Sequence, residues 1–92
     1  MVLKFAPDVQ DFARTLAPGP KKKIRDALHA IARDPRAPGG DVKVLRKDGT
    51  HRYFRIRVGE YRIVYSPRGT VTYVWRIMHR SEGYDWFERL DP

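Results

Sequence analysis

Arginine is the residue type in this chain best suited to bind or stabilise an anion, and it recurs through residues 52–80. The sequence there is RYFRIRVGEYRIVYSPRGTVTYVWRIMHR. The strand pattern described below predicts that one face of a sheet carries Arg55, Arg57, Arg62, Arg76 and Arg80. A planar guanidinium binds phosphate and carboxylate oxygens through paired N–H donors. The shared face therefore predicts an anionic ligand, although each arginine alone is also typical of a solvated surface.

The Gly59-Glu60 dipeptide predicts a two-residue hairpin loop between two alternating runs. This loop pairs Val58 with Tyr61 and Arg57 with Arg62. One face of the hairpin then carries Phe54, Ile56, Val58, Tyr61, Ile63 and Tyr65. The other face carries Arg55, Arg57, Arg62 and Val64. Because directly opposed like charges disfavour strand pairing, we expect something anionic to lie beside Arg57 and Arg62.

A second turn, in Pro67-Arg68-Gly69, sets the faces of the last strand. Loops of three or four residues both fit, and they differ by one residue of register, which exchanges the two faces. We predict the three-residue loop, with Tyr65 opposite Val71, because the other option would bury arginines. The predicted apolar side of this strand carries Val71, Tyr73, Trp75 and Ile77. The predicted basic side carries Thr72, Val74, Arg76, Met78 and Arg80.

Composition limits the partners and the compartment. The 92 residues suffice for one small domain, residues 1–92, with a single modest core. The formal net charge of +8 favours polyanions such as nucleic acid or an acidic protein. We expect no membrane association, because no basic amphipathic stretch or long apolar run occurs, and no signal peptide. The absence of cysteine favours a cytoplasmic location.

The remaining segments predict an α+β fold. Residues 2–5 form an edge strand, and two helices, residues 7–16 and 21–34, follow as an αα-hairpin with one apolar stripe each. Those stripes must pack on the apolar face of a twisted antiparallel sheet, whose centre is a three-strand meander. Residues 41–47 form an extended approach to it. Ser81 is a candidate cap for a short last helix carrying Trp86, Phe87 and Leu90.

These features together resemble the RelE/ParE superfamily of type II toxins. The resemblance rests on the element order, on GEYRIVY in the hairpin, on the apolar strand ending in IMHR, and on SEGY directly after it. It covers almost the whole chain. It implies a toxin that is inhibited by a cognate acidic antitoxin, assembled as a heterotetramer or larger. In RNA-cleaving members it also implies action on messenger RNA in the ribosome.

The resemblance implies a set of site residues. It assigns catalysis to Arg62, Arg80 and Tyr84, which match the family's hairpin arginine, strand-end arginine and following tyrosine. Arg55 and Arg57 match the basic residues that precede the hairpin, but RelE itself has lysines on that strand. We add Arg52, Tyr53 and Arg76 as further RNA-binding candidates on the same strands.

The chemistry expected of these residues needs no cofactor. RNA is cleaved without metal when its own 2′-hydroxyl attacks the adjacent phosphorus, which requires a base, cations and an acid. No metal site is expected, because the histidines are scattered, cysteine is absent and no carboxylate cluster stands out. Tyr84 is the first candidate base, since nearby arginines would lower its pKa. His79 is a candidate acid, or a strand-end residue that makes only a local hydrogen bond.

Three functional classes remain open on the sequence. The first is a metal-independent endoribonuclease toxin. The second is a ParE-like inhibitor of DNA gyrase without nuclease activity, which is disfavoured by the presence of Arg62, Arg80 and Tyr84 together. The third is a non-toxic basic module that binds nucleic acid, and composition alone gives no more than this.

Overall fold

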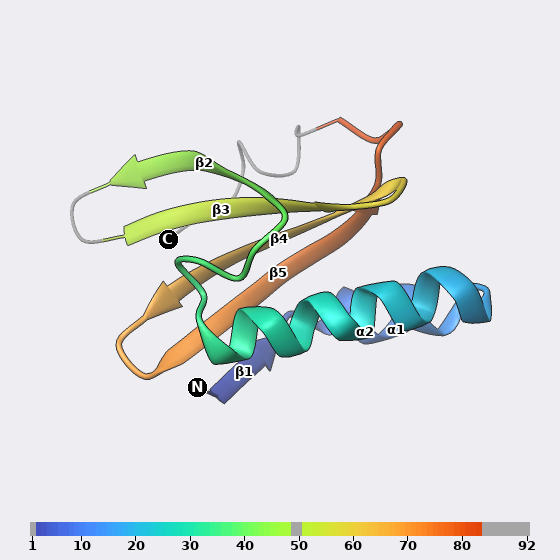
Figure 1. Cartoon of the computed structure of the whole chain (residues 1–92), viewed down its shortest axis with the longest axis horizontal. Coiled ribbons are helices and arrows are strands. Elements are labelled where there is room, and N and C mark those ends of the chain that lie inside the picture. The colour runs from blue at the N-terminus through green and yellow to red at the C-terminus, as the bar shows by residue number, and fades with distance from the viewer. Residues whose placement is uncertain (1, 49–50, 84–92) are drawn as a thin grey trace.

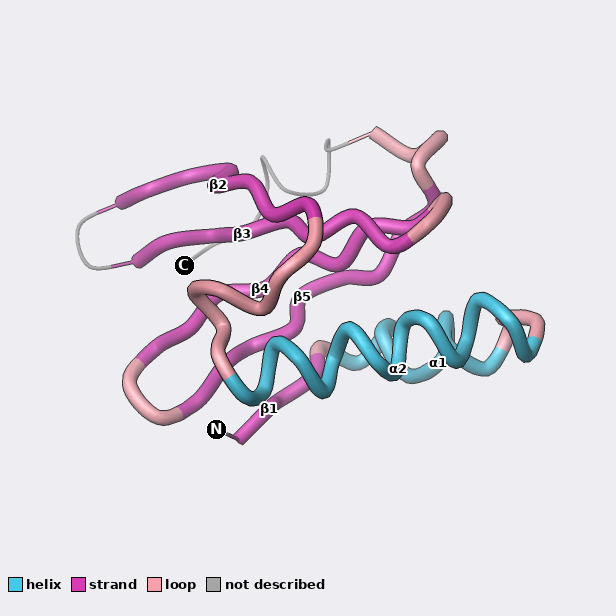
Figure 2. Tube along the Cα trace, viewed as in Figure 1, coloured by secondary structure: helices cyan, strands magenta, loops and turns pink. Residues whose placement is uncertain are grey.

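The computed structural model describes residues 2–48 and 51–83 of the chain. In these ranges the elements are β1 (Val2–Phe5), α1 (Pro7–Arg14), α2 (Pro18–Arg33), β2 (Asp41–Asp48), β3 (His51–Val58), β4 (Tyr61–Arg68) and β5 (Val71–His79) (Figure 1). Both helices lie on the same side of the sheet (Figure 2). The predicted α+β class and the order of its elements are confirmed within this part of the chain.

The strands form one mixed sheet in the order β1-β5-β4-β3-β2. β1 pairs with β5 in parallel, and the other three pairings are antiparallel. The predicted N-terminal edge strand and antiparallel meander are confirmed, but the sheet is mixed rather than antiparallel throughout, because β1 pairs with β5 in parallel. The parallel pairing arises because β1 and β5 lie at opposite ends of the chain, joined by the helices and the meander, and no hairpin dictates their direction.

Pro7 and Pro18 fix where α1 and α2 begin, and Pro35 fixes where α2 ends. Pro7 occupies the first turn of α1, and Pro18 starts α2 three residues before the predicted Lys21. A proline at this position loses nothing, since first-turn N–H groups have no partner within the helix. Asp34 is extended, with φ −152° and ψ 92°, as expected for a residue before proline.

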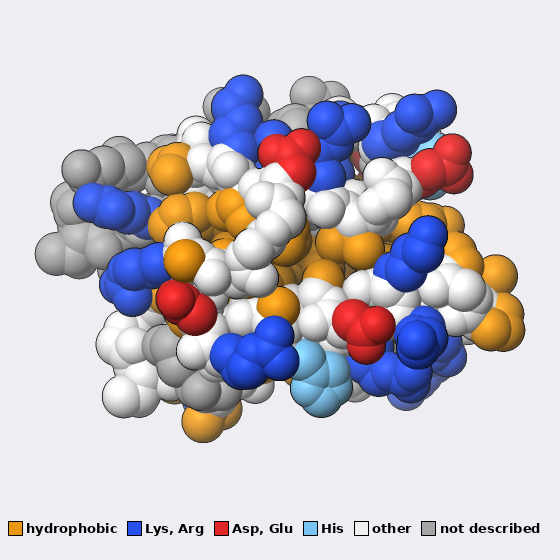
Figure 3. Space-filling model, viewed as in Figure 1, with side chains coloured by type: hydrophobic (Ala, Val, Ile, Leu, Met, Phe, Trp, Pro, Cys, Tyr) orange, Lys and Arg blue, Asp and Glu red, His pale blue; other side chains and the backbone are white. Residues whose placement is uncertain are grey.

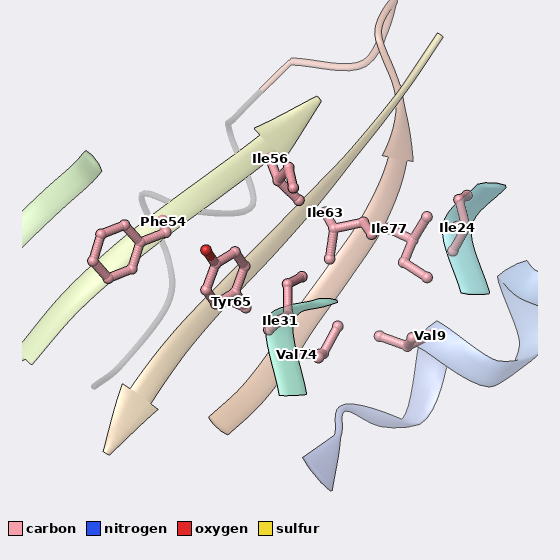
Figure 4. Packing of buried hydrophobic residues seen from close by; sticks show 9 residues of the cluster. All are labelled: Val9, Ile24, Ile31, Phe54, Ile56, Ile63, Tyr65, Val74 and Ile77. Atoms are coloured by element: carbon pink, nitrogen blue, oxygen red, sulfur yellow. The ribbon is translucent and has the colours of Figure 1, made fainter. Parts of the chain in front are cut away.

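The core lies between the two helices and the sheet (Figure 4). Its buried members are Val9, Ile24, Ile31, Phe54, Ile56, Ile63, Tyr65, Val74 and Ile77. The predicted hairpin register is confirmed, including the Arg57–Arg62 pair. The apolar face predicted for β3 and β4 is therefore the face that the helices cover.

The second turn corrects the predicted faces of β5. Pro67 and Arg68 belong to β4, and the loop is Gly69-Thr70, with Gly69 at φ 62°. The register is therefore Arg68 opposite Val71 and Tyr65 opposite Val74, instead of Tyr65 opposite Val71. A glycine at the first central position favours this two-residue loop, just as it does at Gly59.

A bulge at Trp75 completes the correction. The register shifts between Val64, opposite Arg76, and Tyr65, opposite Val74, so that Trp75 has no partner of its own. Without this extra residue Ile63 would face Arg76, and the arginine would enter the core. With the bulge, Ile77 lies opposite Ile63. Val74 is consequently a core residue, and Trp75 lies on the outer face against Val64 and Tyr53.

Residues 41–48 form a full edge strand, β2, where the sequence predicted only an extended approach. Its register with β3 also shifts once, between Val44 and Arg46. The predicted last helix, with Tyr84, Trp86, Phe87 and Leu90, lies outside the described residues. Neither helix in the described ranges has the length and apolar character needed to cross a membrane.

Candidate functional site

The outer face of the sheet, away from the helices, aligns the candidate residues in two cross-strand rows. One row runs Asp41, Arg57, Arg62, Met78 from β2 to β5. The next row runs Lys43, Arg55, Val64, Arg76. Because side chains alternate along each strand, these eight positions share one face. The register thus brings Arg55, Arg57 and Arg62 together, as predicted.

A pocket of about 200 Å³ lies where these rows meet β2. Its lining is Lys43, Leu45, Arg55, Arg57 and Arg62. Four of these five side chains are cationic, and we call this group the cationic pocket. A concave site lined by several cations and low-dielectric walls concentrates anions. The pocket therefore suits a phosphate group.

Asp41 supplies a carboxylate at the rim of the cationic pocket. Its Oδ1 lies 3.6 Å from Arg55 Nη1, and its Oδ2 lies 3.5 Å from Arg57 Nη1. Arg55 Nη1 also donates to the Asp41 carbonyl oxygen at 3.4 Å. Asp41 has an exposed carboxylate, so each ion pair contributes at most about 1 kcal/mol. Among the described residues of this site, one carboxylate lies against the four cations of the pocket, so their summed formal charge is positive.

Sequence reasoning missed both Asp41 and Lys43. The signal lay in the pairing of β2, which puts Asp41 opposite Arg57 and Lys43 opposite Arg55. The sequence predicted an anionic group beside Arg57. The Asp41 carboxylate, which belongs to the chain itself, is one such group. Lys43 adds a lysine to the site from a neighbouring strand, where the preceding strand of the hairpin has only arginines.

Arg76 and Arg80 do not line the cationic pocket. Arg76 Nη2 is 3.4 Å from Glu82 Oε2, and Arg76 also lines a separate pocket with Asp8 and Asp11 of α1. Arg80 is exposed just after β5, where its backbone N–H donates to the Glu60 carbonyl oxygen at 2.7 Å. That bond fixes the chain at the Gly59-Glu60 end of the sheet, which is also the end where Arg57 and Arg62 lie.

His79 faces the helix side of the sheet, opposite Tyr61. Its Nδ1 lies 2.8 Å from Ser81 Oγ and accepts the Ser81 backbone N–H at 3.2 Å. The neutral ring then carries its proton on Nε2, which lies 3.7 Å from Glu60 Oε2. These contacts agree with the local hydrogen-bonding alternative for His79.

The other two RNA-binding candidates differ in exposure. Arg52 is exposed near the start of β3, whereas Tyr53 is fully buried. The Tyr53 hydroxyl accepts a hydrogen bond from Arg68 Nη2 at 2.8 Å, and the Arg68 guanidinium lies within 6 Å of the Tyr53, Tyr73 and Trp75 rings. Tyr53 is therefore a buried residue of the outer face whose hydroxyl holds the Arg68 side chain. Tyr84 lies outside the described residues.

The chemical capacity of the site is electrostatic. In the described ranges no three His, Cys, Asp or Glu residues gather closely enough to hold a metal ion. Arginine and lysine donors in a pocket stabilise a crowded, negatively charged phosphate, which is the requirement of transition-state stabilisation in phosphoryl chemistry. The described lining of the cationic pocket contains donors of this kind.

A family model matches residues 3–84, almost the whole chain, and its description is "ParE toxin of type II toxin-antitoxin system, parDE". The chain belongs to the RelE/ParE family of type II toxins. A curated relative, Toxin RelE3 of Methanocaldococcus jannaschii, is 43% identical over 47 residues. That alignment covers 51% of this chain and 51% of the relative, so the two are matched over about half of their lengths.

Solved structures of this family share the fold. The RelE–RelB complex of Pyrococcus horikoshii matches with a TM-score of 0.78 at 20% identity, covering 89% of this chain and 97% of the other. The complex from Methanococcus jannaschii gives 0.64 at 25% identity, with 90% and 96% covered. The isolated RelE toxin of E. coli gives 0.66 at 19% identity, with 96% and 93% covered.

Proposed function

We propose that this type II toxin is a metal-independent endoribonuclease that cleaves messenger RNA, bound in the ribosome, by attack of the RNA's own 2′-hydroxyl. The observation that carries the proposal is the cationic pocket on the sheet face opposite α1 and α2, in which Arg62 lies with Arg55, Arg57 and Lys43. A pocket with this lining fits the phosphate of the bond to be cleaved. The relative named Toxin RelE3 and the RelE structures support the choice of a RelE-type activity.

The proposed reaction forms one bond and breaks one. The ribose O2′ bonds to phosphorus, and the P–O5′ bond breaks, which leaves a 2′,3′-cyclic phosphate and a 5′-hydroxyl. Arg62 and Arg80 stabilise the charge that grows on the phosphate oxygens, while Arg55, Arg57 and Lys43 hold the strand. We propose Tyr84 as the base that takes the O2′ proton, with a neighbouring acid or water returning a proton to O5′.

The proposed partner is an acidic antitoxin. Three of the matched structures are complexes of RelE with RelB, which supports a protein partner for this chain. A net charge of +8 favours a partner whose carboxylates occupy the positions of phosphates. We propose that this partner is partly disordered when free and assembles with the toxin as a heterotetramer or larger in the cytoplasm.

One observation favours a second candidate function. The matching family model is named for ParE, and the second candidate is accordingly a protein inhibitor of DNA gyrase that cuts no RNA. In that case the cationic pocket would bind acidic protein or DNA phosphate rather than RNA. The two candidates are separated by whether new RNA ends appear.

The decisive experiment expresses the toxin under tight control and maps messenger RNA ends. The parent is expected to create new ends with 2′,3′-cyclic phosphates. In a purified assay whose ribosomes stay intact, it should create them with EDTA as well as without it. Arg62→Ala is expected to lose at least about 100-fold in cleavage rate, the usual range for one lost electrostatic donor. Arg14→Ala, an exposed change of the same charge on α1, should cleave like the parent.

Two outcomes would contradict the proposal. Cleavage that EDTA abolishes and magnesium restores would replace the metal-free mechanism. Toxicity without new RNA ends, together with loss of gyrase supercoiling in a purified assay, would select the second candidate.

A further inference from the structure

An aromatic group lies on the outer face of the sheet, the face opposite α1 and α2 (Figure 2). It consists of Tyr73 and Trp75 of β5 with the Arg68 guanidinium of β4 over both rings, and we call it the aromatic platform. The Tyr73 and Trp75 rings stack, with centroids 5.7 Å apart and an interplanar angle of 21°. The Arg68 guanidinium carbon lies 5.6 Å from the Tyr73 centroid and 5.5 Å from the Trp75 centroid. None of the catalytic or RNA-binding candidates named above belongs to this group.

Hydrogen bonds hold the aromatic platform in place. Trp75 Nε1 donates to Ser66 Oγ at 2.8 Å, and Arg68 Nη2 donates to the buried Tyr53 hydroxyl at 2.8 Å. The indole and the guanidinium are therefore fixed before any ligand binds, which lowers the entropy cost of binding. All three members of the platform are nevertheless partly exposed. They form a flat, preformed surface that another flat ring can cover.

The aromatic platform is continuous with the cationic pocket. Leu45, which lines the pocket, and Trp75 pack against the same buried cluster on the outer face. Arg68 of the platform and Arg62 of the pocket both belong to β4, and the extended strand between them spans about 20 Å at about 3.3 Å per residue. A short stretch of single-stranded RNA covers such a distance. A strand with one phosphate in the pocket can therefore place a nearby base on the platform.

We propose that the aromatic platform binds a base of the single-stranded RNA whose phosphate occupies the cationic pocket. The base stacks on the exposed part of the Tyr73–Trp75 pair, and the Arg68 guanidinium adds a planar cation to the same surface. A purine gains more than a pyrimidine, because its larger ring system covers more of the platform. The inference rests on the proposed function for the ligand being RNA. It adds a base-binding subsite, which gives the toxin a preference among RNA sequences.

The test measures binding of uncleavable single strands to the full chain. The probes are fluorescently labelled 2′-O-methyl RNA oligomers of one length, which lack the attacking hydroxyl. One carries only adenine, one carries only uracil, and one is abasic. The abasic probe keeps every phosphate, so it reports the phosphate contacts alone. By fluorescence anisotropy the parent is expected to bind the adenine probe at least about fivefold more tightly than the abasic probe, with the uracil probe between them.

Three variants identify the surface that binds the base. Tyr73→Leu removes a ring and should weaken the adenine probe at least about fivefold while leaving the abasic probe unchanged. Tyr73→Phe keeps the ring and should bind every probe like the parent. Arg68→Lys keeps the charge but loses the planar guanidinium, so it should weaken the adenine probe more than the abasic probe. In the described part of the chain Tyr73 belongs to neither buried cluster, so Tyr73→Leu is expected to fold, and a thermal melt checks this.

Lys43→Gln in the cationic pocket is the control with the opposite pattern. It removes a phosphate contact, so it should weaken all three probes by the same factor and lower the dependence of binding on salt. Tyr73→Leu removes no charge and should leave the salt dependence of the adenine probe unchanged.

Three outcomes would overturn the inference. They are equal binding of the adenine and abasic probes by the parent, equal weakening of both probes by Tyr73→Leu, and parent-like binding of the adenine probe by folded Tyr73→Leu and Arg68→Lys. RNA cleavage is assayed in parallel to separate this inference from the proposed function. A parent that prefers the adenine probe through Tyr73 but cleaves no RNA would remove the proposed function and leave the platform standing. Cleavage by a parent that does not distinguish the probes would remove the platform alone.

Discussion

Single side chains connect the loops of this molecule to its sheet. The buried Tyr65 hydroxyl donates a hydrogen bond to the Pro35 carbonyl oxygen at 2.7 Å, which ties the segment after α2 to the centre of β4. Asp41, where that segment enters β2, contacts Arg55 and Arg57. Tyr65 therefore helps to set the position from which β2 delivers Asp41 and Lys43 to the cationic pocket.

The Tyr65 hydroxyl gives a prediction for stability against pH. Burial, with a smaller effect of the Asp34 carboxylate, raises the pKa of Tyr65 well above its ordinary value of 10.0. A phenol that titrates near 10 when unfolded and higher when folded stabilises the protein below pH 10, and this contribution is lost as pH rises further. Tyr65→Phe should lower the free energy of unfolding by about 1–3 kcal/mol at neutral pH, since the Pro35 carbonyl loses its partner.

The measurement is urea unfolding of parent and Tyr65→Phe from pH 7 to beyond 10. The gap between them should narrow above pH 10, whereas Tyr73→Phe, on the outer face, should follow the parent throughout. A gap that widens with pH would mean that the Tyr65 hydroxyl is not held in its protonated form by the fold.

At the level of elements, two glycine turns and one bulge determine which side chains reach each face. Gly59 and Gly69 both have positive φ, 61° and 62°, at the first central position of a two-residue loop. Each loop fixes the register of the strands that it joins. The bulge at Trp75 then restores the pairing of Ile63 with Ile77, so that β5 supplies Val74 and Ile77 to one core.

A pair of glycine substitutions tests this use of backbone conformation. A Cβ at Gly69 or at Gly19 would meet no atom within 4 Å, so sterics do not distinguish them. Gly69→Ala forces a left-handed conformation and should cost about 1–2 kcal/mol of unfolding free energy. Gly19→Ala, inside the first turn of α2, should stabilise the protein by up to about 1 kcal/mol. Thermal melts that shift in the same direction for both would disprove the assignment.

At the scale of the whole molecule, positive charge is spread widely and only the fold gives it a focus. Lys and Arg side chains lie across the face seen in Figure 3, with fewer acidic side chains among them. Most of them, including the Lys21-Lys22-Lys23 run at the start of α2, are exposed. The cationic pocket differs because its charges come from three strands and converge on one concavity. Long-range attraction of anions is expected from the whole surface, whereas the proposed phosphate binding belongs to the pocket.

Salt dependence separates these two roles. The logarithm of affinity for single-stranded RNA falls with the logarithm of salt concentration, with a slope of about 0.7 for each phosphate contact. Lys43→Gln should reduce that slope by about 0.7, and Lys22→Gln, an equal change of charge, should leave it nearly unchanged. The slopes come from fluorescence titrations of a labelled oligonucleotide at several salt concentrations. Equal effects of both variants would show that binding is spread over the surface rather than held in the pocket.

The sequence by itself determined the features that depend on neighbours along the chain. Pro7 and Pro35, together with the apolar stripes, predicted the two helices to within a few residues. Gly59-Glu60 predicted the register that opposes Arg57 to Arg62, because a two-residue loop leaves one pairing. The grouping of Arg55, Arg57 and Arg62 on one face followed from that register alone.

Only the tertiary structure decided what depends on packing between distant segments. The alternation of apolar and polar residues along β5 does not reveal the bulge at Trp75. The bulge keeps Arg76 out of the core, and that core is built partly by α1 and α2, which are distant in the sequence. β2 and β3 are consecutive strands, but only the register shift between Val44 and Arg46 places Lys43 opposite Arg55 and Asp41 opposite Arg57. The parallel pairing of β1 with β5 joins strands that no hairpin connects. Strand pairing at long range is set by burial and by the free edges that remain, and those are properties of the folded sheet.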